Sequence, residues 1–569
     1  MIEFNHFTFK YRAQMEPTIK DINLKIEKGE KVLIVGPSGS GKSTIANCIN
    51  GLVPFSYHGD VTGELLIDGK SPKKLGIFGM SKYVGTVLQD PDGQFIGLTV
   101  GEDIAFTLEN DCVGHKEMHE RVEKAAQMVG ITDLLNHSPQ NISGGQKQRV
   151  SMAGVLIDAV DILLFDEPLA NLDPAAGKHT IELIDQIHKN LGTTVVIIEH
   201  RLEDVLVEHV DRIIVVGDGE IVADMTPNEL LCTDILKDQG IREPLYITAL
   251  KYAGCQLSSK DQPESIKTMQ LDAYREQVSS WVRSIPKEEE RSLGAPILSV
   301  EHLDYYYDQR KPILDDVTFE IRRGEMVSIV GRNGAGKSTL SKLICGFLKP
   351  VNGRILYEGK DMAGDTIKQR AERIGIVMQN PNQMISKSMI YDEVALGLKA
   401  RGWSEEEIRP QVEKTLKICG LYPYRNWPIS ALSFGQKKRV TIASILVLNP
   451  EILILDEPTA GQDFKHYTEI MEFLKQLNEE CGITILMITH DMHLMLEYTH
   501  RAIVLCDGKV VTDSTPAKVL TDDSVIHKAS LKRTSLYDLA LGLQLESPDT
   551  FVDSFISYDR KVRGKWQTS

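Results

Sequence analysis

The chain has 569 residues, with 64 Lys and Arg against 80 Asp and Glu and a formal net charge of −16. At roughly 100–200 residues per domain, this length excludes a single small module. A hydrophobic fraction of 42% with 25% charged residues excludes a disordered or collagen-like chain. Because the charge is strongly negative, non-specific binding to a nucleic acid backbone is disfavoured, and no nucleic acid partner is expected.

Neither the first residues nor the apolar runs predict a membrane-spanning segment. The opening MIEFNHFTFK has no cationic stretch followed by an apolar core. The longest apolar runs, such as 162–165 and 195–198, are far shorter than the roughly 20 residues that cross a bilayer. The 8 cysteines form no CxxC pair, which argues for a reducing compartment and against structural zinc. We therefore expect a cytoplasmic chain that does not cross the membrane by itself.

The sequence contains one unit written twice. INLKIEKGEKVLIVGPSGSGKST, which begins at Ile22, aligns without a gap with VTFEIRRGEMVSIVGRNGAGKST, which begins at Val317. The same order of segments follows in each copy: VGTVLQDP and IGIVMQNP, ISGGQKQRV and LSFGQKKRV, ILLFDEP and ILILDEP, VVIIEH and ILMITH. The ends of the copies, EPLYITALKYAG and TSLYDLALGLQL, also resemble each other. A repeat of this kind predicts two equivalent domains, each followed by a small C-terminal element.

We predict a first domain at 1–242, an accessory element and connector at 243–295, a second domain at 296–535, and a C-terminal element at 536–569. The charged, Pro- and Gly-containing stretch between Cys255 and Pro296 predicts an exposed connector with some helix, and a plain linker is the alternative. Short β-branched runs such as KVLIVG, DILLFDEP and TTVVIIEH indicate strands buried on both faces of a mainly parallel sheet. Helical spacing of apolar residues after ISGGQKQ (Val150, Ala153, Ile157) and after LSFGQKK (Val440, Ala443, Val447) indicates an amphipathic helix. The fold class is therefore α/β, twice.

Two glycine-rich segments directly after predicted strands fit the P-loop of nucleotide-binding proteins. Glycine lets backbone amides approach phosphate oxygens at a helix N-terminus, the Lys reaches the β and γ oxygens, and the Ser hydroxyl suits Mg²⁺. We expect the following residues to bind ATP: Gly36, Pro37, Ser38, Gly39, Ser40, Gly41, Lys42, Ser43 and Thr44 in the first copy, and Gly331, Arg332, Asn333, Gly334, Ala335, Gly336, Lys337, Ser338 and Thr339 in the second. Ser43 and Ser338 are also expected metal ligands.

Each copy ends a later apolar strand with Asp-Glu. Asp166 and Asp456 suit coordination of Mg²⁺ through water, and Glu167 and Glu457 suit polarisation of the water that attacks the γ-phosphorus. Parallel α/β sheets place ligands at this end of their strands. Because the pair follows a P-loop in the same order in both copies, it predicts ATP hydrolysis.

This order of motifs resembles the ATP-binding-cassette (ABC) ATPases, here as a tandem pair of P-loop NTPase domains. The most specific segments are ISGGQ at 142–146 and LSFGQ at 432–436, the signature segments of that family. The resemblance implies that each domain has a helical subdomain, between Gln89 and Ile142 in the first copy. It also implies that the halves pair head to tail, with each ATP between one P-loop and the opposite signature. The signature residues expected to contact ATP are Ser143, Gly145, Ser433 and Gly435.

Further roles follow from the resemblance. Gln89 and Gln379 match the glutamine that senses Mg²⁺ and water and couples to a membrane partner, so they are expected in both the catalytic and the metal set. His200 and His490 match the switch histidine at the γ-phosphate. Tyr11 and Tyr307 match the aromatic that stacks on adenine, with core packing as the alternative.

The second signature departs from the family pattern, because Phe434 stands in place of its first glycine. The resemblance places that segment opposite the first P-loop, so the site of Lys42 and Glu167 is expected to be the altered one. We expect both sites to bind ATP and at least one to hydrolyse it, at unequal rates. The adjacent Lys437, Lys438 and Arg439 are expected to form a solvated start to the signature helix.

The chain resembles, over nearly its whole length, the duplicated ATPase of energy-coupling-factor importers of the cobalt and vitamin type. The segments that carry this likeness are QDPDGQF at 89–95, TVGEDIAF at 99–106, QNPNQ at 379–383 and the paired C-terminal elements. It implies a peripheral protein on the cytoplasmic face of the cell membrane, with a transmembrane coupling protein and a small membrane-embedded substrate-binding protein as partners. A tandem ABC ATPase acting on the ribosome and a fused sugar-importer ATPase are the alternatives. The mixed charge of the connector disfavours the first, and the intact second P-loop disfavours the other.

Overall fold

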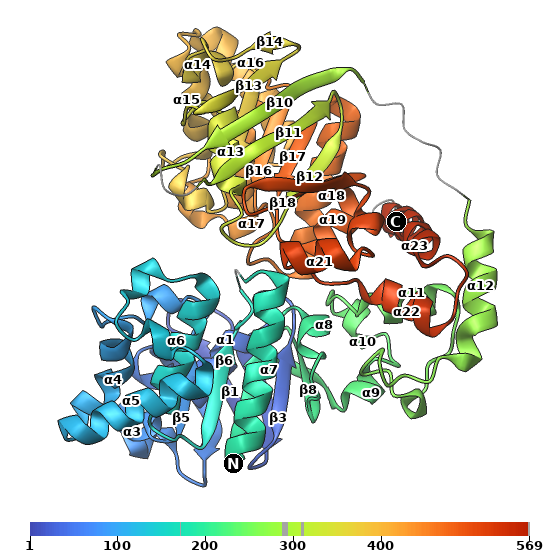
Figure 1. Ribbon diagram of the computed structural model, residues 1–569. Helices are drawn as coiled ribbons and strands as arrows, with labels where there is room; N and C mark the ends of the chain where they lie inside the picture. Colours follow the sequence, from blue (N-terminus) through green and yellow to red (C-terminus); the bar gives the residue numbers. More distant parts are fainter. Residues whose placement is uncertain (171, 287–293, 309–311, 567–569) are drawn as a thin grey trace. The chain divides into compact units, whose positions relative to one another are not determined.

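The β-branched runs of the sequence form the central strands of each half. In the first half β3 (Lys31–Val35) and β7 (Thr194–Ile198) are buried along their whole length, as are β12 (Met326–Val330) and β17 (Thr484–Ile488) in the second. Burial on both faces explains why these strands read as continuous apolar runs and do not alternate. The computed structural model describes residues 1–170, 172–286, 294–308 and 312–566 (Figure 1).

The chain divides into two compact units. The first comprises residues 1–281 with 463–465 and 541–544, and the second comprises 282–462, 466–540 and 545–569. In the first unit a sheet of order β5-β6-β7-β3-β8-β9 is parallel apart from β9, and a smaller antiparallel sheet has the order β2-β1-β4. The remaining strands are β1 (Ile2–Tyr11), β2 (Ile19–Ile26), β4 (Gly59–Ile67), β5 (Val84–Val87), β6 (Ile162–Asp166), β8 (Arg212–Gly217) and β9 (Glu220–Met225).

The second unit repeats this plan. Its larger sheet has the order β15-β16-β17-β12-β18-β19, again parallel apart from the last strand, and its antiparallel sheet has the order β11-β10-β13-β14. Its other strands are β10 (Pro296–Tyr305), β11 (Leu314–Arg322), β13 (Asn352–Tyr357), β14 (Lys360–Asp361), β15 (Ile374–Val377), β16 (Ile452–Asp456), β18 (Arg501–Cys506) and β19 (Lys509–Ser514). The two halves therefore share the α/β topology that the repeat predicts.

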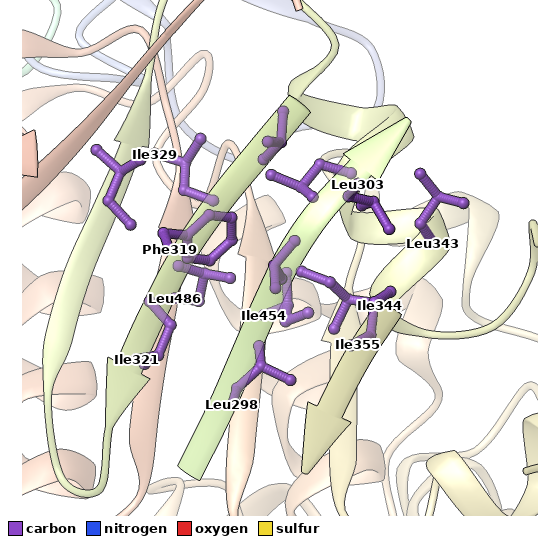
Figure 2. Close-up of a cluster of buried hydrophobic side chains, with 14 of the residues drawn as sticks. Leu298, Leu303, Phe319, Ile321, Ile329, Leu343, Ile344, Ile355, Ile454 and Leu486 are labelled. Atoms are coloured by element: carbon purple, nitrogen blue, oxygen red, sulfur yellow. The ribbon is translucent and has the colours of Figure 1, made fainter. Parts of the chain in front are cut away.

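The core of the second unit lies between its two sheets. Figure 2 shows side chains of the antiparallel sheet among side chains of the parallel sheet and of the helix that follows the second P-loop: Leu298, Phe319 and Ile355, Ile329, Ile454 and Leu486, and Leu343 and Ile344. All of them are buried. A corresponding cluster in the first unit is built around Phe4, Phe9, Ile34 and Ile198. These cores hold the P-loop helix against both sheets.

Helices cover the sheets and form the segment between each Gln89- or Gln379-containing loop and the signature. The helices up to His200 are α1 (Lys42–Ile49), α2 (Leu52–Phe55), α3 (Pro72–Ser81), α4 (Val100–Asn110), α5 (His115–Val129), α6 (Gly144–Leu156) and α7 (Pro174–Leu191). Their counterparts in the second unit are α13 (Lys337–Ile344), α14 (Ile367–Arg370), α15 (Ile390–Ala400), α16 (Glu405–Ile418), α17 (Phe434–Leu446) and α18 (Phe464–Cys481). The expected signature helices form, and each ends one residue before the last predicted apolar position.

Short helices complete the first unit, and they include the segment expected to be a connector. They are α8 (Leu202–Val205), α9 (Pro227–Leu230), α10 (Ile235–Asp238), α11 (Leu245–Tyr252) and α12 (Arg275–Ser284). Leu271, Tyr274, Val278 and Trp281 are buried, so the expectation of an exposed connector is wrong for 271–281. The many charged residues of this segment predict exposure, but its few apolar residues are buried and hold it against the rest of the protein. The part at 287–293, like 567–569 at the end of the chain, lies outside the described residues.

The last helices of the chain lie mostly in the second unit, where the first of them follows His490 and packs against the last. They are α19 (Met492–Tyr498), α20 (Pro516–Val519), α21 (Asp523–Ala529), α22 (Ser535–Gly542) and α23 (Pro548–Trp566). From α23, Arg560 donates to the carbonyl oxygens of Glu497 at 2.7 Å and Thr499 at 3.2 Å, which closes the C-terminal end of α19. Arg563 lies 2.9 Å from the Glu497 carboxylate. None of the helices in the described part of the chain is both long and apolar enough to cross a bilayer.

Candidate functional site

Each P-loop links a buried central strand to the first turn of a helix. The first connects β3 to α1, and the second connects β12 to α13. Gly41 and Gly336 cap these helices with φ of 104° and 101°, a backbone conformation that favours glycine. A Cβ added to Gly36 would lie 2.3 Å from the Val216 carbonyl oxygen, so the strand leaves room for no side chain there. The sequence therefore forms two helix N-termini of the kind that binds phosphate.

The two P-loop lysines are buried inside their own loops. Lys42 donates to the carbonyl oxygens of Gly36 and Pro37, both at 2.8 Å, and Lys337 donates to those of Gly331 at 2.6 Å and Arg332 at 3.0 Å. Burial lowers the pKa of Lys42 to about 8, although the carboxylate of Glu167 opposes the shift. A phosphate anion would replace these neutral carbonyl acceptors with charged ones.

The expected catalytic glutamates share an uncommon backbone conformation. Glu167 and Glu457 directly follow β6 and β16, with φ of 49° and 45°. Their amides donate to the carbonyl oxygens of Ile198 at 2.8 Å and Ile488 at 2.9 Å, at the ends of neighbouring strands. A left-handed conformation costs energy in a residue with a side chain, and it persists here because these bonds fix the turn. Both carboxylates are thereby directed to the edge of the sheet.

In the first half, three expected site residues meet at one carboxylate. The Gln89 amide donates to Glu167 Oε2 at 2.6 Å, and His200 Nε2 lies 2.8 Å from Glu167 Oε1. Burial opposes ionisation of Glu167, but the hydrogen bond and charge of His200 and the charge of Lys42 outweigh it, and its pKa is lowered. Burial and the neighbouring Glu167 raise the pKa of Asp166 to about 6. The two adjacent carboxyl groups are thus driven apart in pKa, as expected of groups with different roles.

The second half brings together the corresponding groups with different partners. His490 Nδ1 lies 2.7 Å from Glu457 Oε1, and the Thr489 hydroxyl donates to Glu457 Oε2 at 3.2 Å. The Ser338 hydroxyl donates to Asp456 Oδ2 at 3.4 Å, so the two expected metal ligands of this half are neighbours. Burial and the charge of Glu457 raise the pKa of Asp456.

A buried glutamate that sequence reasoning missed stands beside His200, the expected switch histidine of the first half. Glu199 accepts hydrogen bonds from the backbone amides of Leu169 at 3.1 Å, His200 at 2.8 Å and Arg201 at 3.3 Å. Burial raises its pKa. Glu199 therefore ties the segment after Glu167 to the histidine segment, whereas Thr489 occupies the matching position in the second half. The aligned repeats have Glu-His in the first copy and Thr-His in the second, and this difference could have singled out Glu199 from the sequence.

The signature serines cap their helices in both halves. Ser143 and Ser433 accept from the amides of Gln146 and Gln436 at 3.4 Å and 3.3 Å, and each glutamine side chain accepts from the serine amide in return. These reciprocal capping boxes fix the helix start. Phe434 is 44% exposed at the first position of α17, so it alters the surface of the signature and leaves the capping bonds in place.

The aromatic residues differ between the halves. The Tyr11 hydroxyl lies 3.1 Å from the hydroxyl of Thr44, and its ring packs edge-on against Phe9. Tyr307 packs edge-on against Tyr305 and is 61% exposed. Tyr307 thus has a face open to a ligand, and stacking on adenine remains a prediction for both tyrosines.

One expectation about the signature helix is wrong. Lys438 is 1% exposed and donates to the carbonyl oxygens of Met378 at 2.9 Å and Gln379 at 2.7 Å, so it is not part of a solvated helix start. Burial lowers its pKa to about 8, opposed by the charges of Asp456 and Glu457. A run of three cations suggested a solvated face, but position on the helix decides which cation turns inward.

A phosphate-binding loop at a helix N-terminus, together with an Asp-Glu pair and a histidine at the adjacent strand ends, defines a P-loop NTPase, and this chain has two. It matches the family model described as ABC transporter at residues 19–170 and 314–460, and the model described as ATP-binding cassette cobalt transporter at residues 233–305.

The relatives give the same assignment. The chain is 60% identical over 563 residues to a protein of Clostridium perfringens (strain 13 / Type A) and 59% identical over 564 residues to one of Enterococcus faecalis (strain ATCC 700802 / V583), both described as ABC transporter ATP-binding proteins, with 99% of each chain covered. The solved structure of cbiO1 from Clostridium perfringens, described as part of the ABC transporter complex cbiONQ, is 38% identical over 44% of this chain and 99% of its own, with a TM-score of 0.39. The chain belongs to the ABC transporter ATP-binding proteins. It binds ATP and is an ATPase coupled to transport.

Proposed function

We propose that this chain is the energy-coupling ATPase of an importer of the energy-coupling-factor type, which powers uptake of a micronutrient through separate membrane proteins. These partners are a transmembrane coupling protein and a small membrane-embedded substrate-binding protein, and the chain lies on the cytoplasmic face of the membrane. The match of residues 233–305 to a cobalt transporter ATPase model supports this class of cargo. We keep the boundaries 1–242, 243–295, 296–535 and 536–569 as part of the proposal.

The observation that carries the proposal is a short path from exposed apolar side chains to the catalytic carboxylate. Ile96 and Leu98 are 65% and 83% exposed in the loop after Gln89, and Leu88 is exposed directly before it. Gln89 itself contacts Glu167 at 2.6 Å. A membrane partner that covers this loop would therefore reach the site of hydrolysis through one side chain.

Within each half, we propose that Glu167 and Glu457 hold and polarise the attacking water, and that His200 and His490 contact the γ-phosphate. The P-loop amides and the lysines Lys42 and Lys337 bind the phosphates. We propose that the signature of the other half completes each ATP-binding site. The residues that do so are Ser143 and Gly145 from the first half, or Ser433 and Gly435 from the second. These roles use groups whose geometry is already fixed at the sheet edge.

The residues present also fit Mg²⁺. Ser338 and Asp456 are 3.4 Å apart, and Ser43 is exposed beside the buried Lys42. With Asp166, Gln89 and Gln379 they form oxygen-donor sets of the kind that Mg²⁺ prefers. When bound, the ion neutralises charge on the β and γ phosphates during transfer.

The test is a pull-down of the tagged Glu167→Gln/Glu457→Gln chain from detergent-solubilised host cells with MgATP, followed by mass spectrometry. Loss of both proposed bases should keep ATP bound and hold the partner-bound state. We expect a stoichiometric polytopic membrane protein together with one or more small membrane proteins. The matched control is the same chain with Lys42→Ala and Lys337→Ala, which should bind ATP weakly. Recovery of ribosomal proteins without a membrane partner would contradict the proposal.

A further inference from the structure

The second half contains a buried cation between its signature helix and its glutamine loop. Lys438 lies one turn into α17, the helix that Ser433 caps, and its ammonium group bonds to the carbonyl oxygens of Met378 and Gln379. These two residues join β15 to the 3₁₀ turn at Pro381–Gln383, against which α17 packs. The catalytic roles derived above make no use of Lys438.

Because the Lys438 ammonium group is buried, it depends on these two carbonyl oxygens. An ammonium group that is removed from water loses its hydration, and only well-placed acceptors compensate for that loss. Two carbonyl oxygens at 2.7 and 2.9 Å supply such acceptors, and charge-assisted bonds of this length are stronger than neutral ones. A shift of the loop away from the helix would leave the ammonium without these partners. The loop and the helix start are therefore held together.

The first half provides an internal comparison. Gln148 occupies the position of Lys438, it is buried, and its amide nitrogen has no hydrogen-bond partner among the residues that the structure describes. The preceding Lys147 instead pairs with Asp92 at 2.6 Å, and Asp92 is largely exposed. In the second half Asn382 stands where Asp92 does, so that ion pair has no charged equivalent. The two halves thus join the same two segments with different chemistry.

We propose that Lys438 is a positioning residue that couples the Gln379 loop to the signature segment of the second half. The link rests on the proposed function in one respect only, namely that a membrane partner acts on the loop. Motion of the loop is then passed to Ser433 and Gly435 through a buried contact that salt does not screen. The first half passes the same motion through the Lys147–Asp92 pair, whose carboxylate is exposed to water and is therefore screened by salt.

The test compares Lys438→Gln, Lys438→Arg and the neighbouring control Lys437→Gln in the full chain. Steady-state ATP hydrolysis and amide hydrogen exchange of residues 378–386 are measured with and without MgATP. We expect Lys438→Gln to speed exchange in this segment and to lower kcat about 10-fold with little change in KM, the size of effect seen when a supporting partner of a site is removed. Lys438→Arg should restore most of both, and Lys437→Gln should match the unchanged chain.

Two results would overturn the proposal. One is a Lys438→Gln chain with unchanged kcat and unchanged exchange at 378–386. The other is an equal loss of kcat in Lys438→Gln and Lys438→Arg without faster exchange in the loop. If Lys438→Gln fails to fold, Gln148→Lys in the first half is the second variant. It should slow exchange at 88–94, and unchanged exchange there contradicts the proposal. Hydrogen exchange needs no membrane partner, so failure of the pull-down above would leave this result independent.

Discussion

The two halves of the chain place Glu167 and Glu457, the proposed bases, in the same left-handed backbone conformation and then surround them with different side chains. In the first half Gln89 and His200 both contact Glu167, and Glu199 holds the neighbouring backbone. In the second half a threonine hydroxyl takes part at Glu457 in place of the buried acid. The backbone conformation at Glu167 and Glu457 is the same in the two copies, while the side chains that contact these glutamates differ. Unequal rates at the two sites are the expected result.

The largest predicted effect comes from the two glutamates proposed as bases. If the site of Glu457 dominates, Glu457→Gln should lower total ATP turnover about 10²–10⁴-fold, the usual cost of losing a general base. Glu167→Gln should then remove only the smaller share. Steady-state phosphate release from the purified full chain measures both. Equal losses in the two variants would argue against dominance by one site.

The signature gives the next largest effect. Phe434→Gly restores the family pattern without removing the Ser433 cap, because the capping bonds use only atoms of Ser433 and Gln436. We expect turnover in a Glu457→Gln background to rise by up to roughly tenfold, which corresponds to about 1.4 kcal/mol in the barrier. Phosphate release in that background reports on the remaining site. The matched change Gly144→Phe should lower turnover in a Glu167→Gln background. A fall in turnover with Phe434→Gly, or a rise with Gly144→Phe, would show that the phenylalanine does not cause the difference in rate between the two sites.

A smaller effect is predicted for the residue before each histidine. Glu199→Thr copies the second half, where the Thr489 hydroxyl accepts from the Asp491 amide two residues on, but it leaves the backbone amides of Leu169 and His200 without their acceptor. Each buried donor left unpaired costs about 1–3 kcal/mol, so the melting temperature should fall by several degrees at about 2–4 °C per kcal/mol. Glu199→Gln keeps an acceptor oxygen and should cost much less. Differential scanning calorimetry measures both variants. A Glu199→Thr chain that melts at the same temperature as the unchanged chain would show that these hydrogen bonds do not contribute to stability.

The smallest effect concerns the exposed pair of the first half. Asp92→Asn copies Asn382 and removes the ion pair with Lys147. Exposed pairs contribute about 0–1 kcal/mol, so unfolding midpoints in urea should barely change. The dependence of turnover on salt should nevertheless weaken between low and physiological ionic strength. Unaltered salt dependence would mean that this pair does not link the loop to α6.

The fold could be predicted from sequence, as could the meeting of several candidate site residues, and the reasons are local. A P-loop, an Asp-Glu pair and a histidine each occur at a strand end, and parallel strands bring those ends to one edge, as the contacts of Glu167 with Gln89 and His200 confirm. Lys438 and Glu199 could not be predicted, since charge in a short window carries no information on which side chain turns inward. Trp281 shows the same limit, because one apolar anchor among many charged residues resembles a linker.

The last helix has a practical consequence for anyone who shortens this protein. Arg560 closes the end of α19, and Arg563 pairs with the buried Glu497 on that helix. α19 begins two residues after His490. A chain cut before residue 560 would leave a buried acid without its arginine and loosen the support of the histidine segment, although every recognised ATP-binding motif would be intact. The motifs therefore leave out residues whose contacts support the histidine segment.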